Sequence, residues 1–263
     1  MTALAHSAMP SQVGLLAGRA VRRILRQPAQ LVFPILFPLI LLAVNTSGLD
    51  AATQLPGFPT ASYLDFALAI PFMQGALFAA LNGGQDLARD IQGGFLDRLA
   101  MTPMSGAALL AGQLGGALFM GVVSAVLYLV VGVAFGAGIA TGIAGAFVLL
   151  LLAVVISFAF ACFGTFVALR AGTGEAVQGF FPLFFVLLFL SSAFFPRDLI
   201  EQDWFAVIAT YNPVSYMVEG IRSLVISGWD GQALAQAFGI SAIAIVAFLV
   251  LSARALRTRL VRT

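Results

Sequence analysis

Long apolar runs dominate this sequence and limit the folds that it can adopt. Six of them approach or exceed the roughly 20 residues that a helix needs to cross a bilayer. They lie at residues 31–48, 63–85, 107–135, 143–169, 176–195 and 234–252. Hydrophobic residues make up 61% of the chain and charged residues 9%, whereas about a quarter of a soluble domain is charged. The sequence therefore predicts an all-α polytopic membrane protein whose residues 31–254 contain six transmembrane helices.

The positions of the basic residues orient the predicted spans. All 13 of them are arginines. With six spans and a cytoplasmic N-terminus, only Arg197 and Arg222 lie outside, in keeping with the positive-inside rule. A seventh crossing within residues 196–233 would move the basic tail, residues 254–263, outside, so we reject it. We expect a multi-pass protein of a prokaryotic plasma (inner) membrane with both termini in the cytoplasm.

The residues before the first apolar run form a disordered start and an amphipathic helix in our prediction. The disordered part covers residues 1–12 and the helix residues 13–27. Apolar side chains fall on one face of this helix, and four arginines fall on the other: Arg19, Arg22, Arg23 and Arg26. A cationic helix of this kind lies in the membrane interface with its guanidinium groups toward anionic headgroups. We therefore expect it to bind membrane lipids.

A short charged segment, residues 86–105, separates the second and third apolar runs. Its charged residues are Asp86, Arg89, Asp90, Asp97 and Arg98. Ile91 and Phe95 are four residues apart and begin an apolar stripe along one side of a short helix. A glycine pair interrupts this helix, and Thr102-Pro103 ends it because proline disfavours helical geometry in the residue before it. We predict a cytoplasmic amphipathic helix that can contact a soluble partner.

The segment before the last run, residues 196–233, is predicted to form a helical hairpin that is broken at Asn212-Pro213. Asn212 can cap the second helix, and Pro213 suits its first turn. That helix would reach only about 22 Å at 1.5 Å per residue, short of the roughly 30 Å hydrocarbon core. We therefore expect an external re-entrant segment. Glu219 and Arg222 are three residues apart, and we expect them to neutralise each other if this helix enters the lipid.

The composition argues against chemistry on this chain. It contains no lysine, so it cannot carry a GxxxxGK[ST] phosphate-binding loop, and any ATP must be bound by another chain. The single histidine, His6, and the single cysteine, Cys162, offer neither a metal-ligand cluster nor a nucleophile with a base. We therefore predict no catalytic site, no metal site and no cofactor here, and we expect no nucleic acid partner.

The order of these parts resembles that of a known family. The sequence GFLDRLAMTPMS (residues 94–105) lies between the second and third spans, and NPVSYMVEGIR (residues 212–222) precedes the last span. Together with the arginine-rich first helix and the six-span layout, they resemble the permease subunits of type-2 ABC exporters, which include daunorubicin-resistance, polysaccharide-export and lipid-export permeases. Many members have E-R-E-x-G-T-L-E-R-L-x-x-T-P in the loop. Here Ile91 and Gln92 stand where a charged pair is common.

The resemblance implies that residues 86–105 are a coupling helix seated in a groove of a separate ABC ATPase subunit. ATP and Mg would belong to that partner, and each complex would hold two ATPase subunits and a second permease subunit, identical or paralogous. The substrate would be an amphipathic drug, a lipid or a lipid-linked glycan, exported from the cytoplasm or the inner leaflet. The predicted coupling residues are Asp86, Arg89, Asp90, Gly94, Phe95, Leu96, Asp97, Arg98, Thr102 and Pro103.

In this family the substrate path lies between two permeases and is lined by the first, second and fifth spans. The fifth span here is rich in phenylalanine, which suits a large apolar substrate, although such helices more often face lipid or pack against neighbours. The polar residues within the first two spans more often join helices than contact substrate. The candidate path residues are Asn45, Gln74, Asn82, Phe181, Phe184 and Phe185, and those of the external segment are Asn212, Pro213, Tyr216, Glu219 and Arg222.

Two other functions stay open on the sequence. A self-contained secondary transporter normally has ionisable residues inside the membrane and matched broken helices. Neither is predicted here, because Asp65 lies at the edge of a span and Glu219 lies in the external segment. A membrane scaffold without transport activity is the second alternative. An ATPase with a phosphate-binding loop encoded in the neighbouring reading frame would favour the exporter.

Overall fold

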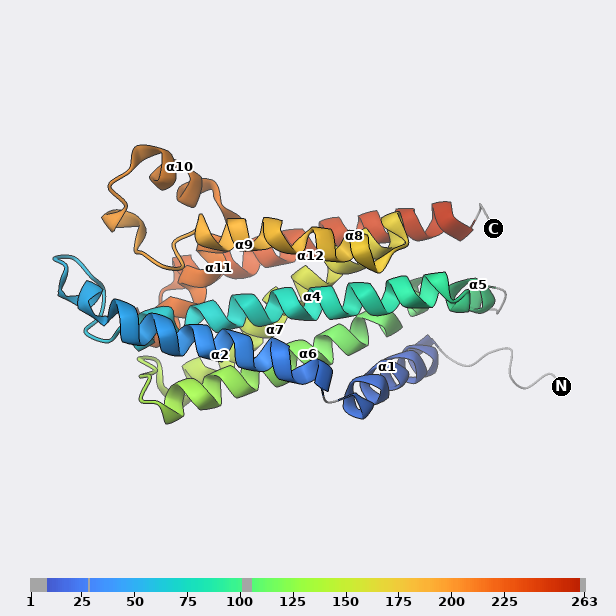
Figure 1. Cartoon of the computed structure of the whole chain (residues 1–263), viewed down its shortest axis with the longest axis horizontal. Coiled ribbons are helices and arrows are strands. Elements are labelled where there is room, and N and C mark those ends of the chain that lie inside the picture. Colours follow the sequence, from blue (N-terminus) through green and yellow to red (C-terminus); the bar gives the residue numbers. More distant parts are fainter. Residues whose placement is uncertain (1–8, 28, 101–105, 261–263) are drawn as a thin grey trace.

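The structure is a computed structural model that describes residues 9–27, 29–100 and 106–260. These residues form an elongated bundle of helices, and no strand occurs among them (Figure 1). The all-α prediction is therefore confirmed over these ranges. The first helix begins at Met9, so the last four residues of the segment predicted to be disordered are helical. The rest of that segment lies outside the described residues.

The helices have the following bounds in chain order. They are α1 (Met9–Arg26), α2 (Ala29–Leu49), α3 (Tyr63–Ala67), α4 (Ala69–Gln92), α5 (Phe95–Ala100), α6 (Gly106–Ala134), α7 (Gly142–Ala171), α8 (Gly174–Gly179), α9 (Phe181–Phe189), α10 (Asp203–Tyr211), α11 (Pro213–Arg222) and α12 (Gly231–Leu260). Three short turns of other helix types are η1 (Asp50–Gln54), η2 (Arg197–Leu199) and η3 (Ser223–Ser227).

Five helical stretches in the described chain are long and apolar enough to cross a membrane. They are residues 31–54, 63–92, 106–134, 142–171 and 231–259. The predicted fifth span is instead divided into α8 and α9, a shorter apolar stretch at Gly174–Phe189. Gly179 ends α8, and Pro182 lies in the first turn of α9, where a proline can replace a residue whose N–H has no helical partner. Figure 1 shows α8 and α9 returning the chain along the bundle.

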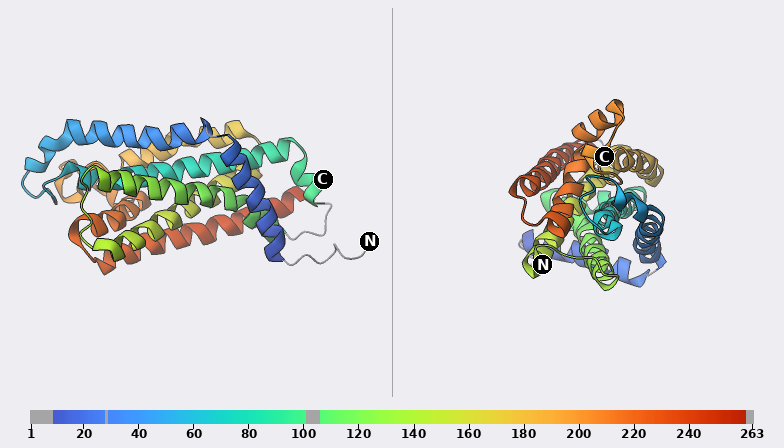
Figure 2. Two further views of the ribbon diagram at one scale, coloured as in Figure 1. Left: turned by 90° about the horizontal axis from the view of Figure 1, so that it is seen from below. Right: turned by 90° about the vertical axis from the view of Figure 1, so that its left-hand side faces the viewer.

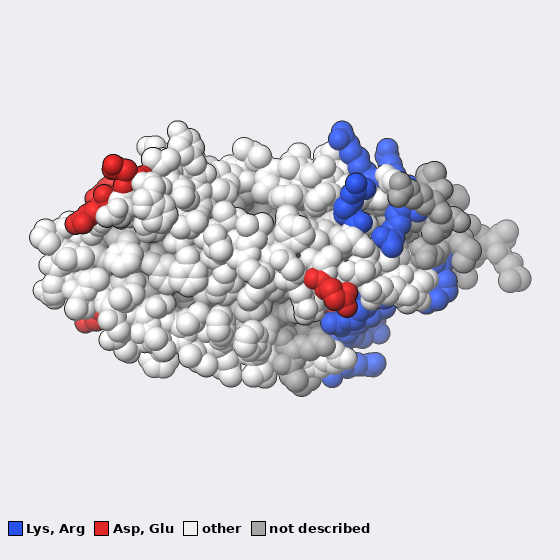
Figure 3. All heavy atoms as spheres, turned by 45° about the horizontal axis from the view of Figure 1, so that its top comes forward, with Lys and Arg blue, Asp and Glu red and all other residues white. Residues whose placement is uncertain are grey.

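The two ends of the bundle differ in charge. The start of α1, the short α5 and the end of α12 lie together at one end (Figures 1 and 2). On the face drawn in Figure 3, arginines gather at this end, whereas acidic side chains gather mostly at the opposite end. We call these the basic end and the acidic end; α10 belongs to the acidic end.

The central helix of the bundle is α4, which is the most buried of the five long stretches and packs against α7, α6 and α2. Two glycines bring α4 and α7 into backbone contact. A Cβ added at Gly84 would lie 3.0 Å from the carbonyl oxygen of Gly164, and one at Gly164 would lie 3.0 Å from the carbonyl carbon of Ala80. Small residues allow helices to approach this closely.

Replacing Gly164 with alanine should therefore lower the melting temperature of the detergent-solubilised protein. The added Cβ would push two backbones apart, and overpacking of this kind costs about 1–3 kcal/mol. Gly239→Ala is the matched control, because a Cβ at Gly239 of α12 meets no atom within 4 Å. It should leave the melting temperature unchanged or slightly higher, since alanine favours a helix over glycine. Equal melting temperatures for the two variants would contradict the close α4–α7 contact.

The predicted helix break at Asn212-Pro213 is confirmed, because α10 ends before it and α11 begins at Pro213. The side-chain oxygen of Asn212 accepts a hydrogen bond from the N–H of Val214 at 3.0 Å. Its amide nitrogen donates to the carbonyl oxygens of Leu187 at 2.6 Å and Leu190 at 3.1 Å. Asn212 thus caps α11 and also binds carbonyl groups that the end of α9 leaves free.

Candidate functional site at the basic end

The N-terminal helix α1 crosses α6 at the basic end and touches its backbone. A Cβ added at Gly115 of α6 would lie 2.5 Å from the Cβ of Ala17, and one at Gly116 would lie 2.8 Å from the Cβ of Ala20. Leu16 and Ile24 on the same side of α1 are buried. This side of α1 is therefore packed against α6.

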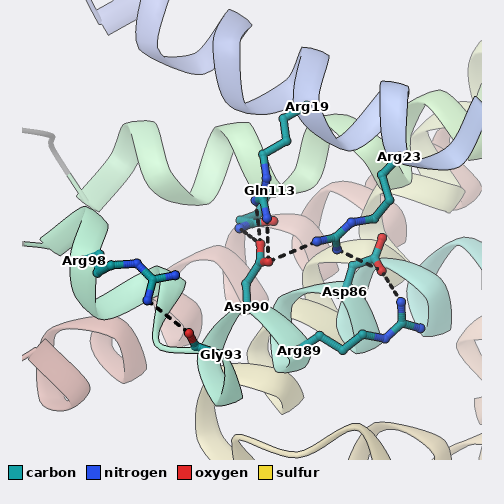
Figure 4. A network of polar contacts seen from close by, with 8 residues as sticks. All are labelled: Arg19, Arg23, Asp86, Arg89, Asp90, Gly93, Arg98 and Gln113. Carbon is teal, nitrogen blue, oxygen red and sulfur yellow. Dashed lines mark hydrogen bonds and ion pairs between the residues drawn. The ribbon is translucent and has the colours of Figure 1, made fainter. Parts of the chain in front are cut away.

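A buried carboxylate joins three helices beside this contact. Asp90, near the end of α4, is 4% exposed. Both of its oxygens accept hydrogen bonds from Arg19 of α1, at 2.9 and 2.8 Å, in the two-pronged geometry that guanidinium groups favour. Gln113 of α6 donates at 3.1 Å, and Arg23 of α1 donates at 3.3 Å (Figure 4). The hydrogen bond to Asp90 raises the pKa of Arg19 above its usual value.

A second carboxylate lies one helical turn earlier on α4. Asp86 contacts Arg23 at 3.2 Å and Arg89 at 3.0 Å. Figure 4 shows the two carboxylates side by side, with Arg23 reaching both. We call the six residues Arg19, Arg23, Asp86, Arg89, Asp90 and Gln113 the Asp90 network. It fixes α1 and α6 to the end of the central helix.

The short helix α5 is attached to this network through aromatic and apolar contacts. The guanidinium carbon of Arg19 lies 3.8 Å from the ring centroid of Phe95, a cation–π contact. Leu96 is 1% exposed and packs in a cluster with the ends of α4 and α7. Gly94 has φ 64°, a conformation that favours glycine, and it turns the chain between α4 and α5. Arg98 is exposed and donates to the carbonyl oxygen of Gly93 at 3.3 Å.

The structure places the predicted coupling residues unequally. Asp86 and Asp90 face α1 and form ion pairs with its arginines. Arg89 and Arg98 are exposed. Gly94, Phe95 and Leu96 form the turn and the inner side of α5. Asp97 lies within α5, and its side chain is outside the part of the structure that is described. Thr102 and Pro103 fall outside the described residues.

The pairing of α1 with α4 was not predicted from the sequence. All four arginines of α1 were expected to face headgroups, whereas Arg19 and Arg23 point to the carboxylates of α4; Arg22 and Arg26 are exposed. One signal was present in the sequence. The two arginines are four residues apart and so are the two aspartates, so that two crossing helices can present matching pairs of opposite charge.

Comparison with known proteins decides what kind of membrane protein this is. The family model for the ABC-2 type transporter matches residues 11–226, most of the chain. The chain belongs to the ABC-2 type transporter family. A daunorubicin resistance ABC transporter permease protein, DrrB1, of Streptomyces coeruleorubidus is 27% identical over 208 residues, which cover 79% of this chain and 72% of the relative.

Membership makes this chain a multi-pass ABC exporter permease. An ABC-2 permease has no catalytic site of its own, and the family in general works with ATPase partners and as a dimer of permeases. The family therefore favours the exporter over the secondary transporter and the scaffold, and it confirms the resemblance on which the coupling assignment depends.

The predicted path residues of this ABC-2 permease separate into two groups. Two residues of α9 pack on aromatic rings of neighbouring helices. The ring centroid of Phe181 lies 5.7 Å from that of Phe78 on α4, and the centroid of Phe185 lies 6.3 Å from that of Phe37 on α2. Phe184 faces the other way, because it packs on Phe160 and Phe163 of α7, at centroid distances of 5.1 and 4.9 Å.

The polar path residues also lie apart from one another. Gln74 is 1% exposed in the core of α4, and its side-chain oxygen has no hydrogen-bond partner in the described chain. Asn82 borders a small cavity of about 20 Å³ beside the Asp90 network. Asn45 is half-buried near the far end of α2. The structure therefore does not bring the six predicted residues into one site.

The expected ion pair between Glu219 and Arg222 at the acidic end is wrong. Glu219 binds Arg197 instead, through both carboxylate oxygens. That guanidinium also lies over the ring of Tyr216, 4.6 Å from its centroid, and the hydrogen bond to Glu219 raises the pKa of Arg197. Arg222 is 8% exposed and donates to three carbonyl oxygens, at 3.0 to 3.2 Å: those of Phe66, Ser192 and Ala193. Two residues three apart on a helix can still take different partners when other segments lie closer.

Proposed function

We propose that this ABC-2 permease is the membrane half of an ATP-driven exporter and that a separate ATPase drives it through α5. The observation that carries the proposal is the link from α5 through Arg19 to Asp90. Because Asp90 lies on the most buried long helix, a force applied to α5 would reach the centre of the bundle. Two ATPase subunits with ATP and Mg, and a second permease subunit, would complete the transporter.

The geometry of α5 suits a contact with a soluble partner. It lies at the basic end, where it follows the end of α4 at the tip of the bundle (Figure 1). Its inner side is fixed by Leu96 and Phe95, so that a partner would move α5 and α1 together. Arg98 is exposed and offers a charge to an acidic groove, where charge-assisted hydrogen bonds are strong.

The substrate class in this proposal is an amphipathic drug, a lipid or a lipid-linked glycan that leaves the cytoplasm or the inner leaflet. The name of the Streptomyces relative, which refers to daunorubicin resistance, supports a drug. The half-buried rings of Phe37, Phe181 and Phe185 and the buried ring of Phe78 form a continuous aromatic cluster across α2, α4 and α9. The half-buried rings of this cluster can bind a large apolar molecule with little loss of rotamer freedom. We propose that the cluster lines the path between two permeases.

We also propose six crossings with both termini in the cytoplasm, where α8 and α9 supply the fifth. These two helices reach about 24 Å at 1.5 Å per residue, and residues 190–196 extend the chain further toward the acidic end. The helices α7 and α12 both end at the basic end (Figures 1 and 2). The chain must therefore cross once from the end of α7 to the acidic end before α12 begins, and α8 and α9 make this crossing. The helices α10 and α11 form the re-entrant hairpin at the acidic end.

Cysteine labelling tests this topology, because the chain's only cysteine, Cys162, is buried. Thr258→Cys at the basic end should react with an impermeant maleimide only after the cells are permeabilised. Gln202→Cys at the acidic end should react in intact cells. Both positions are exposed, so accessibility to solvent is matched. Labelling of Thr258→Cys in intact cells would contradict the proposed orientation.

A further inference from the structure

The arginine-bearing side of α1 forms a basic cleft next to the Asp90 network. The cleft has a volume of about 350 Å³ and is lined by Arg19, Arg22, Arg23, Arg26 and Gln27. Two of these arginines are already neutralised by the carboxylates of α4. The other two, Arg22 and Arg26, pair with no carboxylate within residues 9–27, 29–100 and 106–260. The cleft therefore carries unbalanced positive charge.

Apolar side chains project into solvent next to these two arginines. Leu15 is 69% exposed and Leu25 is 59% exposed. Leu15 and Arg22 are seven residues apart and Arg22 and Leu25 are three apart, spacings that place both leucines on the same side of the helix as Arg22. Phe33, near the start of α2, is 59% exposed as well. The outer side of α1 thus carries both apolar and cationic groups. An amphipathic anionic ligand needs both kinds of group at its binding site.

The position of the cleft also agrees with a membrane ligand. On the face drawn in Figure 3, arginines gather where the uncharged surface of the bundle ends. At this level a bilayer would present its headgroups, and long arginine side chains reach such groups while their stems contact the acyl chains.

We propose that this cleft binds an anionic phospholipid, with its phosphate between Arg22 and Arg26 and its acyl chains against Leu15, Leu25 and the start of α2. Guanidinium groups bind phosphate oxygens through paired N–H donors. A free phosphate would use only the arginines and would gain nothing from the exposed leucines. The lipid would hold the outer side of α1 while Asp90 holds its inner side. This proposal does not depend on what the permease exports.

The test measures which lipids the purified full chain retains. The protein is solubilised from membranes of equal parts phosphatidylglycerol and phosphatidylcholine, and bound lipid is counted by native mass spectrometry. We expect wild type to retain phosphatidylglycerol in preference to phosphatidylcholine. In Arg22→Gln/Arg26→Gln this preference should fall by roughly five- to thirty-fold, the loss that one to two surface arginines imply. Addition of inorganic phosphate at millimolar concentration should leave the wild-type preference in place.

A matched control removes the same charge elsewhere at the basic end. Arg254 and Arg257 of α12 are also exposed, and Arg254→Gln/Arg257→Gln should keep the wild-type preference. An equal loss in both double variants would overturn the proposal, because general charge at the basic end would then explain the retention. Displacement of phosphatidylglycerol by inorganic phosphate, or an unchanged preference in Arg22→Gln/Arg26→Gln, would overturn it too.

Discussion

Replacing Asp90 with asparagine should reduce ATP-driven export by about tenfold or more and lower the melting temperature of the permease. The substitution keeps the size of the side chain but removes the charge that binds Arg19 and Arg23. Leaving a partly buried charge without its partner costs about 1–3 kcal/mol. The same change releases α1 and, through the contact of Arg19 with Phe95, loosens α5. Export is measured as substrate accumulation in inverted vesicles, and stability by thermal unfolding in detergent.

A double-mutant cycle separates the Arg19–Asp90 pair from general effects of charge. Arg19→Gln and Asp90→Asn each break the pair, so the double variant should lose little more stability than the worse single variant. Glu175→Gln, an exposed carboxylate on α8, is the control for loss of a negative charge and should behave like wild type. If the two single effects simply add, the pair does not hold the helices together.

Changing α5 itself should uncouple the permease from its ATPase with little effect on its folding. Arg98→Glu reverses an exposed charge, and Phe95→Ala removes a half-buried ring that contacts Arg19. Asp97→Lys reverses the remaining charge of the helix. We expect each variant to insert normally, to lose most of the co-purified ATPase, and to lower substrate-stimulated ATP hydrolysis by about tenfold. For Arg98→Glu and Asp97→Lys the reason is that charge-assisted contacts at a protein interface cost roughly 1.5–3 kcal/mol when removed. For Phe95→Ala it is the loss of the ring that joins α5 to Arg19.

The control for this second prediction is Arg254→Glu, which reverses an exposed charge at the same end of the bundle but lies on α12. It should retain the ATPase and its stimulation. A common loss in Arg98→Glu and Arg254→Glu would mean that overall charge at the basic end attracts the ATPase. Unchanged stimulation in all three α5 variants would refute the coupling role of α5.

Local patterns in the sequence predicted much of this fold. The apolar runs located five long helices, the Asn212-Pro213 pair located the break between α10 and α11, and the glycines at 93–94 located the turn before α5. Each of these features depends on residues that are near one another in the chain, so that helix length, capping and turn chemistry can be inferred directly. The division of α8 from α9 was missed, although Pro182 was visible.

Partners that lie far apart in the sequence could not be predicted in the same way. Arg19 and Asp90 are 71 residues apart, and Arg197 and Glu219 are 22 residues apart. Their contacts depend on where one helix crosses another, which is set by close backbone packing such as that of Gly115 against α1. The hydrophobic pattern gives the buried face of a helix but not its neighbour. The candidate site was therefore predicted as a segment, and its internal network only became evident in three dimensions.

Reconstitution tests the central claim, that this permease takes its energy from a separate ATPase. The purified permease is placed in vesicles with or without its ATPase subunit, and movement of labelled substrate is followed with ATP, with a proton gradient, and with neither. We predict movement only when both the ATPase and hydrolysable ATP are present. Movement driven by the proton gradient in vesicles that contain the permease alone would contradict the account.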